Sequence, residues 1–505
     1  MEMSSTKNRL LVVATAGGKP NAEPLLEIAK ILNTRGYSIE FATLEGQEKW
    51  ADKYPFISKV HILGPGVAPA VQRASYARMM DWKAPRLFND CQPLFDAKMF
   101  LESSWPSVYS SLSVLMQDRD ARPDFILADY LVDAVIDMHA EYRVPIAMHW
   151  PQMPTGMLPA SYVPGIPGLQ VDVLSSENAT LWQRLQNELV KIHILPWVIK
   201  YYWWRRKMRA RAGVTRSLPS GPKPSHLVLV NTFFAVDTPK DLPSNVAPIG
   251  PIMQDEYPHL TEPCLSFIEK HKKIIYVAFG THILLQDKLF RQIMDGLLVV
   301  LQNRVADGVI WSIGGTHRKH LANGCDRNML FVNFAPQRAV LAHPHTRAFI
   351  SHAGRASTNE AVFHGVPVVS VAIYFDQLQN AMRLHDAGVG IPLDKHDFNA
   401  DDLANAVTQV VKDSSGDFRH NCLRLKAIAR IASRRKHSGA DLIEEVLADH
   451  EGRHVDSVCK RPMHLQTADV RMPVWKAKNW DLYAIAIVAS GLFALSTRVL
   501  VNWFY

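Results

Sequence analysis

The feature that most constrains the fold is an alternation of apolar strands and amphipathic helices, which occurs twice along the 505 residues. In the first series an apolar run at 10–16 leads through a glycine loop into a helical pattern at 24–35, and a strand pattern at 38–43 follows Gly36. Strands joined through a helix pair in parallel, because the helix returns the chain to the edge where the previous strand began. The sequence therefore predicts a parallel α/β sheet in its first half.

The same alternation continues through the first half and then restarts. A strand pattern at 125–128 ends at Asp129, a helical pattern reaches about Tyr142, and residues 145–149 form the next strand. The second series has strand patterns at 227–230, 274–279, 309–313 and 348–351 and a helical pattern at 287–302. Because ligands bind beyond the carboxyl ends of parallel strands, the sequence predicts two Rossmann-like domains that face a cleft.

A proline-rich stretch separates the two series. Pro239, Pro243, Pro248 and Pro251 stiffen this part of the chain and interrupt regular structure. We therefore expect a first domain at 1–235, a linker at 236–262, a second domain at 263–455, a juxtamembrane linker at 456–480 and a transmembrane helix at 481–505.

The transmembrane prediction comes from an apolar stretch near residue 505. Residues 482–497 carry no charge, and the apolar character resumes after Arg498, which is long enough to snorkel to the interface. A helix from 482 to 505 would rise roughly 36 Å, enough to cross a hydrocarbon core of about 30 Å. Aromatic residues lie at both ends of the stretch, namely Trp475, Trp480, Tyr483, Trp503 and Tyr505. A single membrane span is favoured over a buried core helix.

Basic residues indicate the orientation of this span. Arg471, Lys476 and Lys478 precede it and almost nothing basic follows, so the positive-inside rule places the large N-terminal part in the cytosol. We expect a single-pass tail anchor in the endoplasmic reticulum membrane, with the catalytic part cytosolic. The apolar run at 10–16 is short for a signal peptide, and the sequon at Asn178 is expected to carry no glycan.

The formal net charge of +8 does not indicate nucleic-acid binding. Much of the basic excess lies at 205–211 and 426–436, and no nucleic-acid motif accompanies either stretch. The first stretch follows an aromatic cluster, at Trp197, Tyr201, Tyr202, Trp203 and Trp204, which suits the level of lipid headgroups; a helix packed against its own domain is the alternative. Five widely spaced cysteines favour a reducing compartment and no structural zinc.

Two turns in the second half have the composition of a phosphate site. Gly280 and Thr281 follow one strand, and His352 and Gly354 follow another just before a helical pattern. The N-terminus of a helix offers free N–H donors and a partial positive charge, and glycine allows close backbone approach. Ser357 adds a side-chain donor in the first turn of that helix.

An ordered series of motifs surrounds these turns. It comprises Phe334-Ala335-Pro336-Gln337, Leu341-Ala342-His343-Pro344, Phe349-Ile350-Ser351-His352-Ala353-Gly354, Glu360-Ala361, Gly365-Val366-Pro367, Asp376-Gln377 and Asn380-Ala381. This series resembles the signature block of the UDP-glycosyltransferase family, the large inverting family of plant, animal and fungal enzymes. Weaker likenesses, from Pro24-Leu25-Leu26 to Tyr276–Thr281, extend over nearly the whole chain. The resemblance implies a GT-B type α/β fold, with the acceptor in the first domain and the nucleotide sugar in the second.

The resemblance also implies roles for individual residues. Phe334, where the family stacks a Trp on uracil, would stack on the base, and Gln337 would bond it. Glu360 would accept from the ribose hydroxyls. Thr281, His352 and Ser357 would hold the diphosphate beside Gly280, Gly354 and Arg355, and Asp376 and Gln377 would bind the sugar. This scheme needs no metal, because the helix end and His352 stabilise the leaving diphosphate, and no cofactor beyond the UDP-sugar co-substrate.

The sequence departs from the family at the catalytic base. Most members have a His three residues before the proline that opens the first helix, and this chain has Asn21 there, while the usual partner acid is retained as Asp129. An amide cannot take a proton from an acceptor hydroxyl. Ala356 and Arg355 also replace the usual residues of the phosphate turn, so the nucleotide and the sugar stay open.

Three explanations of Asn21 are compatible with the sequence, and the alignment of its glycine loop is itself open by a residue or two. The acceptor is acidic or strongly nucleophilic, such as a phenol, enol, carboxylate or amine, so that positioning suffices. Alternatively His149 or His282 acts as the base, although both also suit a structural role. Finally, the protein binds a nucleotide sugar without transferring it.

The favoured function is an inverting transfer of a hexose, glucose above all, from a UDP-sugar to an apolar small molecule or lipid. Met153, Met157, Leu158, Tyr162 and Val163 would line a greasy acceptor pocket, or are plain core. A catalytically silent nucleotide-sugar-binding membrane protein is the alternative. A sugar-nucleotide epimerase or hydrolase on a similar scaffold is the third.

Overall fold

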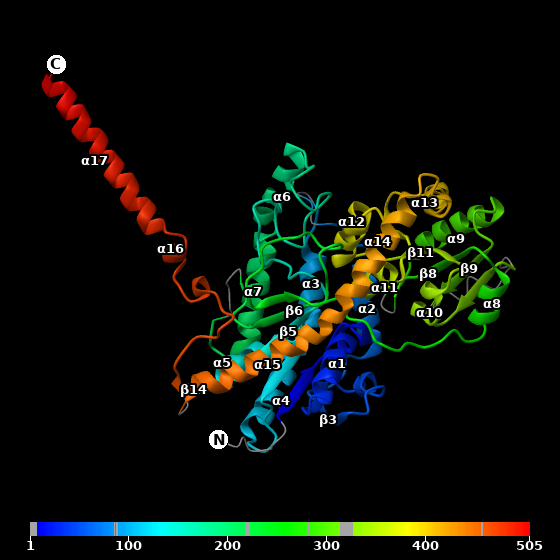
Figure 1. Cartoon of the computed structure of the whole chain (residues 1–505), viewed down its shortest axis with the longest axis horizontal. Coiled ribbons are helices and arrows are strands. Elements are labelled where there is room, and N and C mark those ends of the chain that lie inside the picture. The colour runs from blue at the N-terminus through cyan, green and yellow to red at the C-terminus, as the bar shows by residue number, and fades with distance from the viewer. Residues whose placement is uncertain are drawn as a thin grey trace.

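The computed structural model describes residues 8–84, 86, 89–217, 223–280, 283–313, 327–455 and 458–504. They form two parallel α/β sheets, each with helices on both faces, and a C-terminal helix that projects from the body (Figure 1). This arrangement confirms the predicted fold class. The sheets follow one another along the chain, so each series of strands and helices forms its own layer structure.

The first sheet has seven strands in the order β3-β2-β1-β4-β5-β6-β7. Its strands are β1 (Arg9–Val13), β2 (Ser38–Thr43), β3 (Ile57–Ile62), β4 (Phe125–Asp129), β5 (Ile146–Trp150), β6 (Leu227–Val230) and β7 (Val246–Pro248). Its helices are α1 (Lys19–Thr34), α2 (Pro69–Met79), α3 (Gln92–Leu101), α4 (Trp105–Gln117), α5 (Ala134–Tyr142), α6 (Leu181–His193) and α7 (Leu195–Arg211). All neighbouring strands pair in parallel.

The second sheet has six strands in the order β10-β9-β8-β11-β12-β13. Its strands are β8 (Ile274–Ala278), β9 (Gly308–Ser312), β10 (Met329–Val332), β11 (Thr346–Ser351), β12 (Val368–Ala372) and β13 (Gly390–Asp394). Its helices are α8 (Cys264–Lys270), α9 (Asp287–Gln302), α10 (Gln337–Ala342), α11 (Arg355–His364), α12 (Asp376–Asp386), α13 (Ala400–Lys412) and α14 (Asp417–Ala432). The remaining elements are α15 (Lys436–Arg453), β14 (His454–Val455), β15 (Val458–Cys459), α16 (Val474–Ala477) and α17 (Trp480–Phe504).

Strand periodicity explains why both faces of each sheet are covered. In β1, Leu10 and Val12 lie in a core with α1, whereas Leu11 and Val13 lie in a core with α4 and α5. All four side chains are fully buried. Successive side chains of a strand point to opposite faces, so a continuously apolar strand needs a helical layer on each side.

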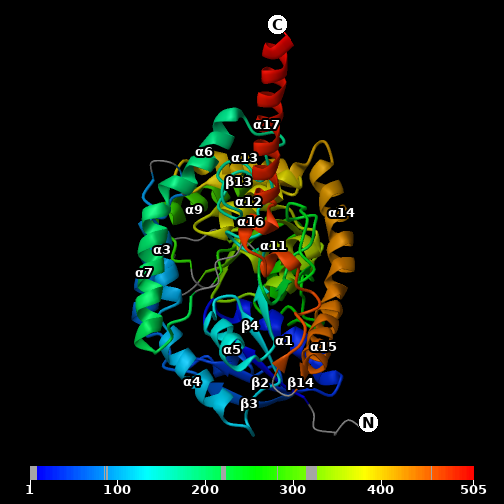
Figure 2. The same cartoon turned by 90° about the vertical axis from the view of Figure 1, so that its left-hand side faces the viewer.

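Two segments from one half of the sequence pack on the sheet that the other half forms. Helix α15 follows the second sheet, yet its Ile443 and Leu447 lie in the core beside α1, and Arg35 forms ion pairs with Asp441 and Glu444. Figure 2 shows α14 and α15 running along one edge of the molecule from one sheet to the other. Helix α15 therefore lies within 263–455 in the sequence but packs on the first sheet, because its buried face is complementary to α1.

The end of α2 crosses in the other direction. Met79, Met80 and Trp82 lie in the hydrophobic core of the second sheet. Lys395 Nζ donates to the Met80 carbonyl at 2.6 Å and to the Ile373 carbonyl at 2.7 Å. The two halves thus share side chains on two sides, in addition to the chain connection between them.

The start of α1 differs from the sequence expectation and matters for the site. The helix begins at Lys19, not at Pro24, so Asn21 lies in its first turn and not in a loop. Pro20 explains the early start, because a proline in the first turn lacks an N–H that would have no partner there anyway. Pro24 is tolerated inside the helix.

Helix α17 is the one described helix long and apolar enough to cross a membrane. It has 25 residues, and none of its most apolar window is buried in the molecule. By length and composition alone it matches the predicted span at 481–505. Its residues are exposed throughout, so it makes no core with either sheet.

Candidate donor and acceptor sites

The imidazole of His352 lies between two glycines that the second sheet brings together. Strands β8 and β11 are paired, with Ala278 beside Ser351, so the turns that follow them adjoin. A Cβ on Gly280 would lie 3.0 Å from His352 Cε1, and a Cβ on Gly354 would lie 2.3 Å from His352 Nε2. Both positions must therefore lack a side chain for the ring to lie there. Thr281 and His282 are outside the described residues.

The helix that begins beyond this ring has an open N-terminus. Gly354 is the N-cap of α11, and no side chain caps the helix. Ala353, just before it, has φ +57°, a left-handed conformation that non-glycine residues seldom adopt. Asn380 Nδ2 donates to the Ala353 carbonyl at 3.0 Å and holds this turn. An uncapped helix end beside an imidazole is suited to bind a phosphate group.

A hydrogen-bonded network lies on the next turn of α11. Gln337 Nε2 donates to Glu360 Oε2 at 2.7 Å and to Ser357 Oγ at 3.2 Å, and Tyr276 Oη donates to Gln337 Oε1 at 3.3 Å. Gln337, Ser357 and Glu360 thus lie in hydrogen-bond contact with one another. The Gln337 Nε2 group, expected to bond the base, here donates to Glu360 instead. Burial raises the pKa of Glu360 to about 7, against the opposing effect of its bond from Gln337.

Phe334 lies beside this network in the chain and has an unusual exposure. Its side chain is 76% exposed, on the connection between β10 and α10. A phenyl ring left in water gains stability when a flat ligand covers it. Its position three residues before Gln337 gives the network an exposed aromatic neighbour.

The two residues expected at the sugar have different environments. Asp376 is the first residue of α12, where Asn380 Nδ2 donates to its Oδ2 at 2.9 Å, and burial raises its pKa. Gln377 is buried, and its Oε1 accepts from the backbone N–H groups of Ile373 and Tyr374 at 2.9 and 3.1 Å. The Asp376 carboxyl is thus partly accessible, whereas the Gln377 side-chain oxygen is engaged by the backbone of the loop before α12.

The contacts of Arg355 are with Thr232 and Asp237 and not with the open end of α11. Its guanidinium is buried and contacts Thr232 Oγ1 and Asp237 Oδ2, the latter at 3.4 Å. Burial lowers the pKa of Arg355 to about 10 although Asp237 opposes that shift. The positive charge of Arg355, which was expected beside the diphosphate, is thus already matched by the buried Asp237 carboxylate.

Asp237 is a feature that the sequence did not single out. Its Oδ1 lies 2.9 Å from Arg383 of α12, and Thr232 Oγ1 donates to its Oδ2 at 2.5 Å. The carboxyl is 1% exposed, and its pKa lies below the ordinary value despite burial because Arg383 and Arg355 flank it. No spacing in the sequence links positions 237, 355 and 383, so only the fold reveals this junction between the halves.

On the first sheet, Asn21 and Asp129 lie in contact. Asn21 Nδ2 donates to Asp129 Oδ2 at 3.2 Å, and the Leu131 N–H donates to Asp129 Oδ1 at 3.1 Å. Gly17 makes this possible, since a Cβ there would lie 2.3 Å from Asn21 Nδ2. Asp129 is fully buried, and that burial raises its pKa. Asn21 is half-buried, so it is the more accessible member of the pair.

His149 approaches the same oxygen of Asp129 that accepts from Asn21. Its Nδ1 is 4.0 Å from Asp129 Oδ2, at the end of the neighbouring strand β5. The His149 side chain is 1% exposed. A ring that is almost fully buried can influence the Asp129 carboxyl, but it presents almost no surface to a ligand.

Hollows in the part of the chain that the structure describes include the following two. One lies between the halves, where Met153 and Val163 face Gln379 and Arg383; its volume of about 20 Å³ has room for little more than one water. Of the five residues expected to line an acceptor pocket, these two apolar residues line it. Leu158 is buried in the same small core as Met153, with Met157 packed against it, and Tyr162 donates to the Pro239 carbonyl.

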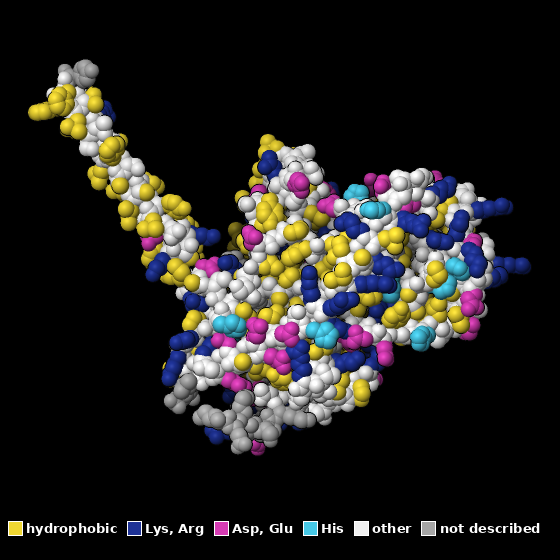
Figure 3. All heavy atoms as spheres, viewed as in Figure 1, with side chains coloured by type: hydrophobic (Ala, Val, Ile, Leu, Met, Phe, Trp, Pro, Cys, Tyr) yellow, Lys and Arg dark blue, Asp and Glu magenta, His cyan; other side chains and the backbone are white. Residues whose placement is uncertain are grey.

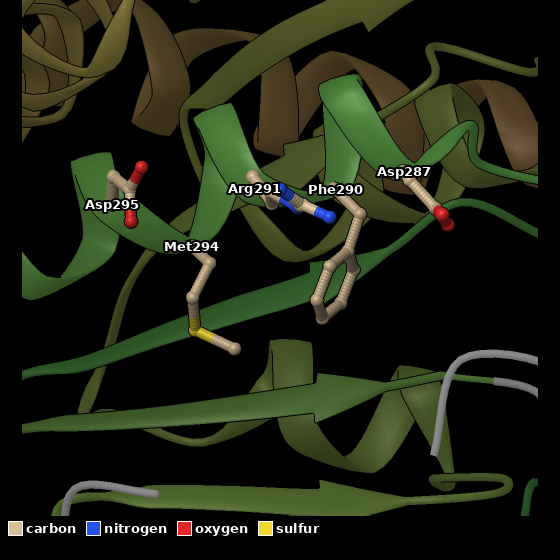
Figure 4. A pocket seen from close by; sticks show the side chains of 5 residues that line it. All are labelled: Asp287, Phe290, Arg291, Met294 and Asp295. Carbon is tan, nitrogen blue, oxygen red and sulfur yellow. The ribbon is translucent and has the colours of Figure 1, made fainter. Parts of the chain in front are cut away.

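The second hollow, of about 210 Å³, lies along α9 and holds none of the predicted site residues (Figure 4). It is lined by Asp287, Phe290, Arg291, Met294 and Asp295. Acidic and basic side chains alternate along it, and it lies on the outer layer of the second sheet. It offers no grouping that matches the donor or acceptor predictions.

The two parallel α/β sheets have the GT-B fold that solved glycosyltransferase structures share. A glycosyltransferase of kitacinnamycin has the same fold, with a TM-score of 0.62 and 18% identity over 87% of this chain and 99% of its own. Phytolacca americana UGT2, solved with UDP-2-fluoro-glucose and pterostilbene, has a TM-score of 0.58 and 18% identity over 88% and 100%.

The chain belongs to the family described as UDP-glucoronosyl and UDP-glucosyl transferase, whose model matches residues 72–435. UDP-glycosyltransferase stmC of Aspergillus ustus is 42% identical over 95% of this chain and 94% of its own. UDP-glycosyltransferase FPY2 of Fusarium mangiferae is 37% identical over 99% of each chain. The family expected from the motifs is thereby confirmed, and the protein is a UDP-sugar-dependent glycosyltransferase.

Proposed function

We propose that the protein transfers a hexose, glucose above all, with inversion from its UDP-sugar to an apolar small molecule or lipid with an acidic hydroxyl group. The observation that carries the donor half is the nesting of His352 between Gly280 and Gly354 at the open end of α11. The family description, which includes glucosyl transfer, supports the choice of sugar. The first domain, 1–235, binds the acceptor, and the second, 263–455, binds the donor.

The donor lies along α11 from base to sugar in this proposal. The exposed Phe334 stacks on uracil beside Gln337, and Glu360 accepts hydrogen bonds from the ribose hydroxyls. The diphosphate binds at the helix N-terminus near His352 and Ser357, where the partial positive charge stabilises the leaving group. Asp376, the partly open carboxylate of α12, accepts from the sugar hydroxyls, while Gln377 supports its loop.

The acceptor half explains the preference for an acidic hydroxyl. Asn21 donates to Asp129, which leaves the Asn21 carbonyl oxygen to accept from the acceptor. An amide orients that hydroxyl but takes no proton, so the acceptor must ionise readily, as a phenol or enol does. The acceptor oxygen bonds to the anomeric carbon as the bond to the diphosphate breaks, and its proton passes to solvent.

The buried position of His149 supports this proposal over a relocated base. Its ring is 1% exposed, so an acceptor bound beside Asn21 does not contact it directly. His149 is therefore assigned to stabilising the Asp129 carboxylate, which the Asn21 amide needs as its partner.

The membrane arrangement is part of the same proposal. Helix α17 spans the endoplasmic reticulum membrane once and leaves the catalytic domains in the cytosol, as the basic residues before it favour. An apolar acceptor partitions into that membrane, which concentrates it near the enzyme. The mass of a peptide containing Asn178 from protein made in a eukaryotic host should show no glycan.

The test combines binding with turnover on two acceptor classes. Purified full-length protein is expected to bind UDP-glucose in calorimetry and to glycosylate lipophilic phenols faster than alcohols of equal size. Asn21→His is expected to raise turnover of the alcohols by about ten- to a thousand-fold, because a general base contributes on the order of a hundred- to ten-thousand-fold. Asn21→Gln, which keeps an amide, is the matched control and gives no such gain.

The outcomes separate the two halves of the proposal. Absence of binding to any UDP-sugar would refute the donor site. Binding without turnover on either acceptor class would assign a silent, nucleotide-sugar-binding role. Equal turnover of phenols and alcohols by the unaltered protein would refute the acidic-acceptor proposal and return attention to a histidine base.

A further inference from the structure

Helices α6 and α7 form one bent rod on the outside of the first domain. α6 ends at His193 and α7 begins at Leu195, and Ile194 between them keeps helical backbone angles. Leu195 and Pro196 mark the bend, as expected for a proline in the first turn of a helix. We call residues 181–211 the α6–α7 arm.

The inner face of the arm is fixed to the body. Val190, Ile194 and Tyr201 pack in a small core with α3, and Tyr201 Oη donates to Glu102 at 2.6 Å. Further along, Arg205 and Arg209 form ion pairs with carboxylates of the body. This face matches the alternative in which the aromatic cluster packs against its own domain.

The outer face presents an apolar stripe to solvent, which the exposed Glu188 interrupts between Leu185 and Ile192. Its members recur at intervals of three, four or seven residues: Leu181, Leu185, Ile192, Leu195, Ile199 and Trp203. They are between 44% and 74% exposed. Figure 3 shows hydrophobic side chains at the protruding α6 end and along α17. Soluble proteins rarely expose this many large apolar side chains along one helical face without a partner.

Basic residues flank the stripe. The exposed ones in the arm are Arg184, Lys191, Lys200, Arg206, Lys207 and Arg211. The arm contains a single acidic residue, Glu188, which pairs with Lys191 at 2.6 Å and accepts from the Gly165 N–H at 2.9 Å. An apolar stripe bordered by lysine and arginine complements the acyl chains and negative headgroups of an anionic bilayer.

The position of α17 is consistent with such a surface. Figures 1 and 2 show α6 and α17 rising on the same side of the body. None of the most apolar window of α17 packs on the two domains. Met463 before it packs in the core of the first sheet, and Asp469 pairs with Lys223 at 2.7 Å. The angle of α17 to the body is therefore set by the connection at 470–479 and not by a buried interface, so the body can lie down on a bilayer that α17 spans.

From the stripe, its basic border and the neighbouring helix, we propose that the outer face of the α6–α7 arm lies in the headgroup region of an anionic lipid bilayer, as a second membrane contact besides α17. The apolar side chains enter the acyl boundary, and the flanking cations bind lipid phosphates and carboxylates. The aromatic residues on the two faces of α7 then have different contacts. Tyr201 packs against the first domain, and Trp203 faces lipid.

This contact would also place the hollow between the domains, which is lined by both apolar and charged side chains, beside the membrane. Asn187 of the arm exchanges hydrogen bonds with Val171, donating to its carbonyl at 3.0 Å and accepting from its N–H at 2.9 Å. Residues 153–174 of the same connection line the hollow between the domains. When the arm lies on the bilayer, the hollow between the domains is therefore close to ligands dissolved in the membrane.

The test uses the full chain in phosphatidylcholine nanodiscs with or without phosphatidylserine. Ile192 is replaced by the photo-cross-linker p-benzoylphenylalanine, and the matched control carries it at Leu423 of α14, a residue 53% exposed on the opposite side of the molecule. Because α17 holds both variants in the disc, a difference in lipid adducts reports which face meets the bilayer. Mass spectrometry of the irradiated peptides measures the adducts.

We expect lipid adducts at position 192 well above those at 423, and more of them when phosphatidylserine is present. Arg206→Glu with Lys207→Glu should remove most of the increase, because one cation near an anionic surface is worth about a five-fold change in binding. Equal adducts at 192 and 423 would overturn the proposal. A protein–protein cross-link at 192 would assign the stripe to a second copy, and adducts that ignore phosphatidylserine and the charge reversal would refute the anionic preference.

Discussion

The carboxyl group of Glu360 makes the donor site testable by pH. Burial raises its pKa to about 7, so in the free protein this group titrates near neutrality. A folded-state pKa above the unfolded one contributes stability that is present below about pH 4.5 and is lost as pH rises through about 7. Donor binding works in the opposite direction, because the ribose hydroxyls donate to the charged carboxylate.

The size of the effect follows from this pKa. About one-tenth of Glu360 is ionised at pH 6 and about nine-tenths at pH 8. If only the ionised form binds the ribose, the apparent affinity is reduced by the fraction that is competent. The affinity for the donor should therefore rise about tenfold over these two pH units, which corresponds to about 1.4 kcal/mol.

The assay is calorimetric titration of the full-length protein with UDP-glucose at several pH values between 6 and 8. UDP-glucose is preferred to UDP because its diphosphate is esterified at both ends and carries no proton that titrates in this range. Glu360→Gln is the control, since an amide of the same shape keeps the contact but has no charge to lose. The ratio of the two affinities at each pH cancels the titration of His352 or of any other group.

The prediction has a clear failing result. A ratio of affinities that stays constant from pH 6 to 8 would show that Glu360 does not titrate with the donor, and the proposed ribose contact would be wrong. A ratio that falls as pH rises would mean that the donor binds the protonated carboxyl, with the hydrogen bond reversed.

Three further changes test other parts of the structure. Gly354→Ala places a Cβ 2.3 Å from His352 Nε2 and should weaken donor binding more than tenfold without lowering the melting temperature much, as paired calorimetry and thermal unfolding will show. Asp237→Asn leaves two buried arginines uncompensated and should reduce the free energy of unfolding by about 3–5 kcal/mol in urea denaturation. Burial lowers the pKa of His450 to about 4 and that of His226 to about 3, so the unfolded chain takes up protons first as the medium becomes acidic. Stability should thus fall from about pH 6.5 down to about pH 4, and His450→Gln should flatten that fall in pH-dependent melting; an unchanged profile would exclude this residue.

The parts of the fold that the sequence predicts well are those where one short pattern determines one element. Helix α9 lies at Asp287–Gln302, as its apolar periodicity predicts, and α17 lies within one residue of the predicted span. The continuously apolar strands of each sheet centre also appear within two or three residues of their predicted ends, because burial on both faces leaves few alternatives. The donor turns after β8 and β11 follow from the same patterns.

The parts that escape the sequence depend on tertiary contacts. No local pattern says that α15 returns to the first sheet or that Met79 and Trp82 enter the core of the second. The bonding of Arg355 is a case of the same kind, since its partner Asp237 lies 118 residues away. Pro24 misled the prediction of α1 for a local reason, because the helix had already begun at the more N-terminal Pro20.

These tertiary contacts bear on how an acceptor enters. The hollow between the domains has a volume of about 20 Å³, far below the several hundred that a small-molecule site needs. Gln379 of α12 bonds to the Gln170 carbonyl across it, so this contact must break for the hollow to widen. The two crossing segments, α15 and the end of α2, resist separation of the domains elsewhere, because each would expose buried side chains. Movement of the connection at 153–174 therefore requires less free energy than separation of the domains. Asn187 joins this connection to the α6–α7 arm.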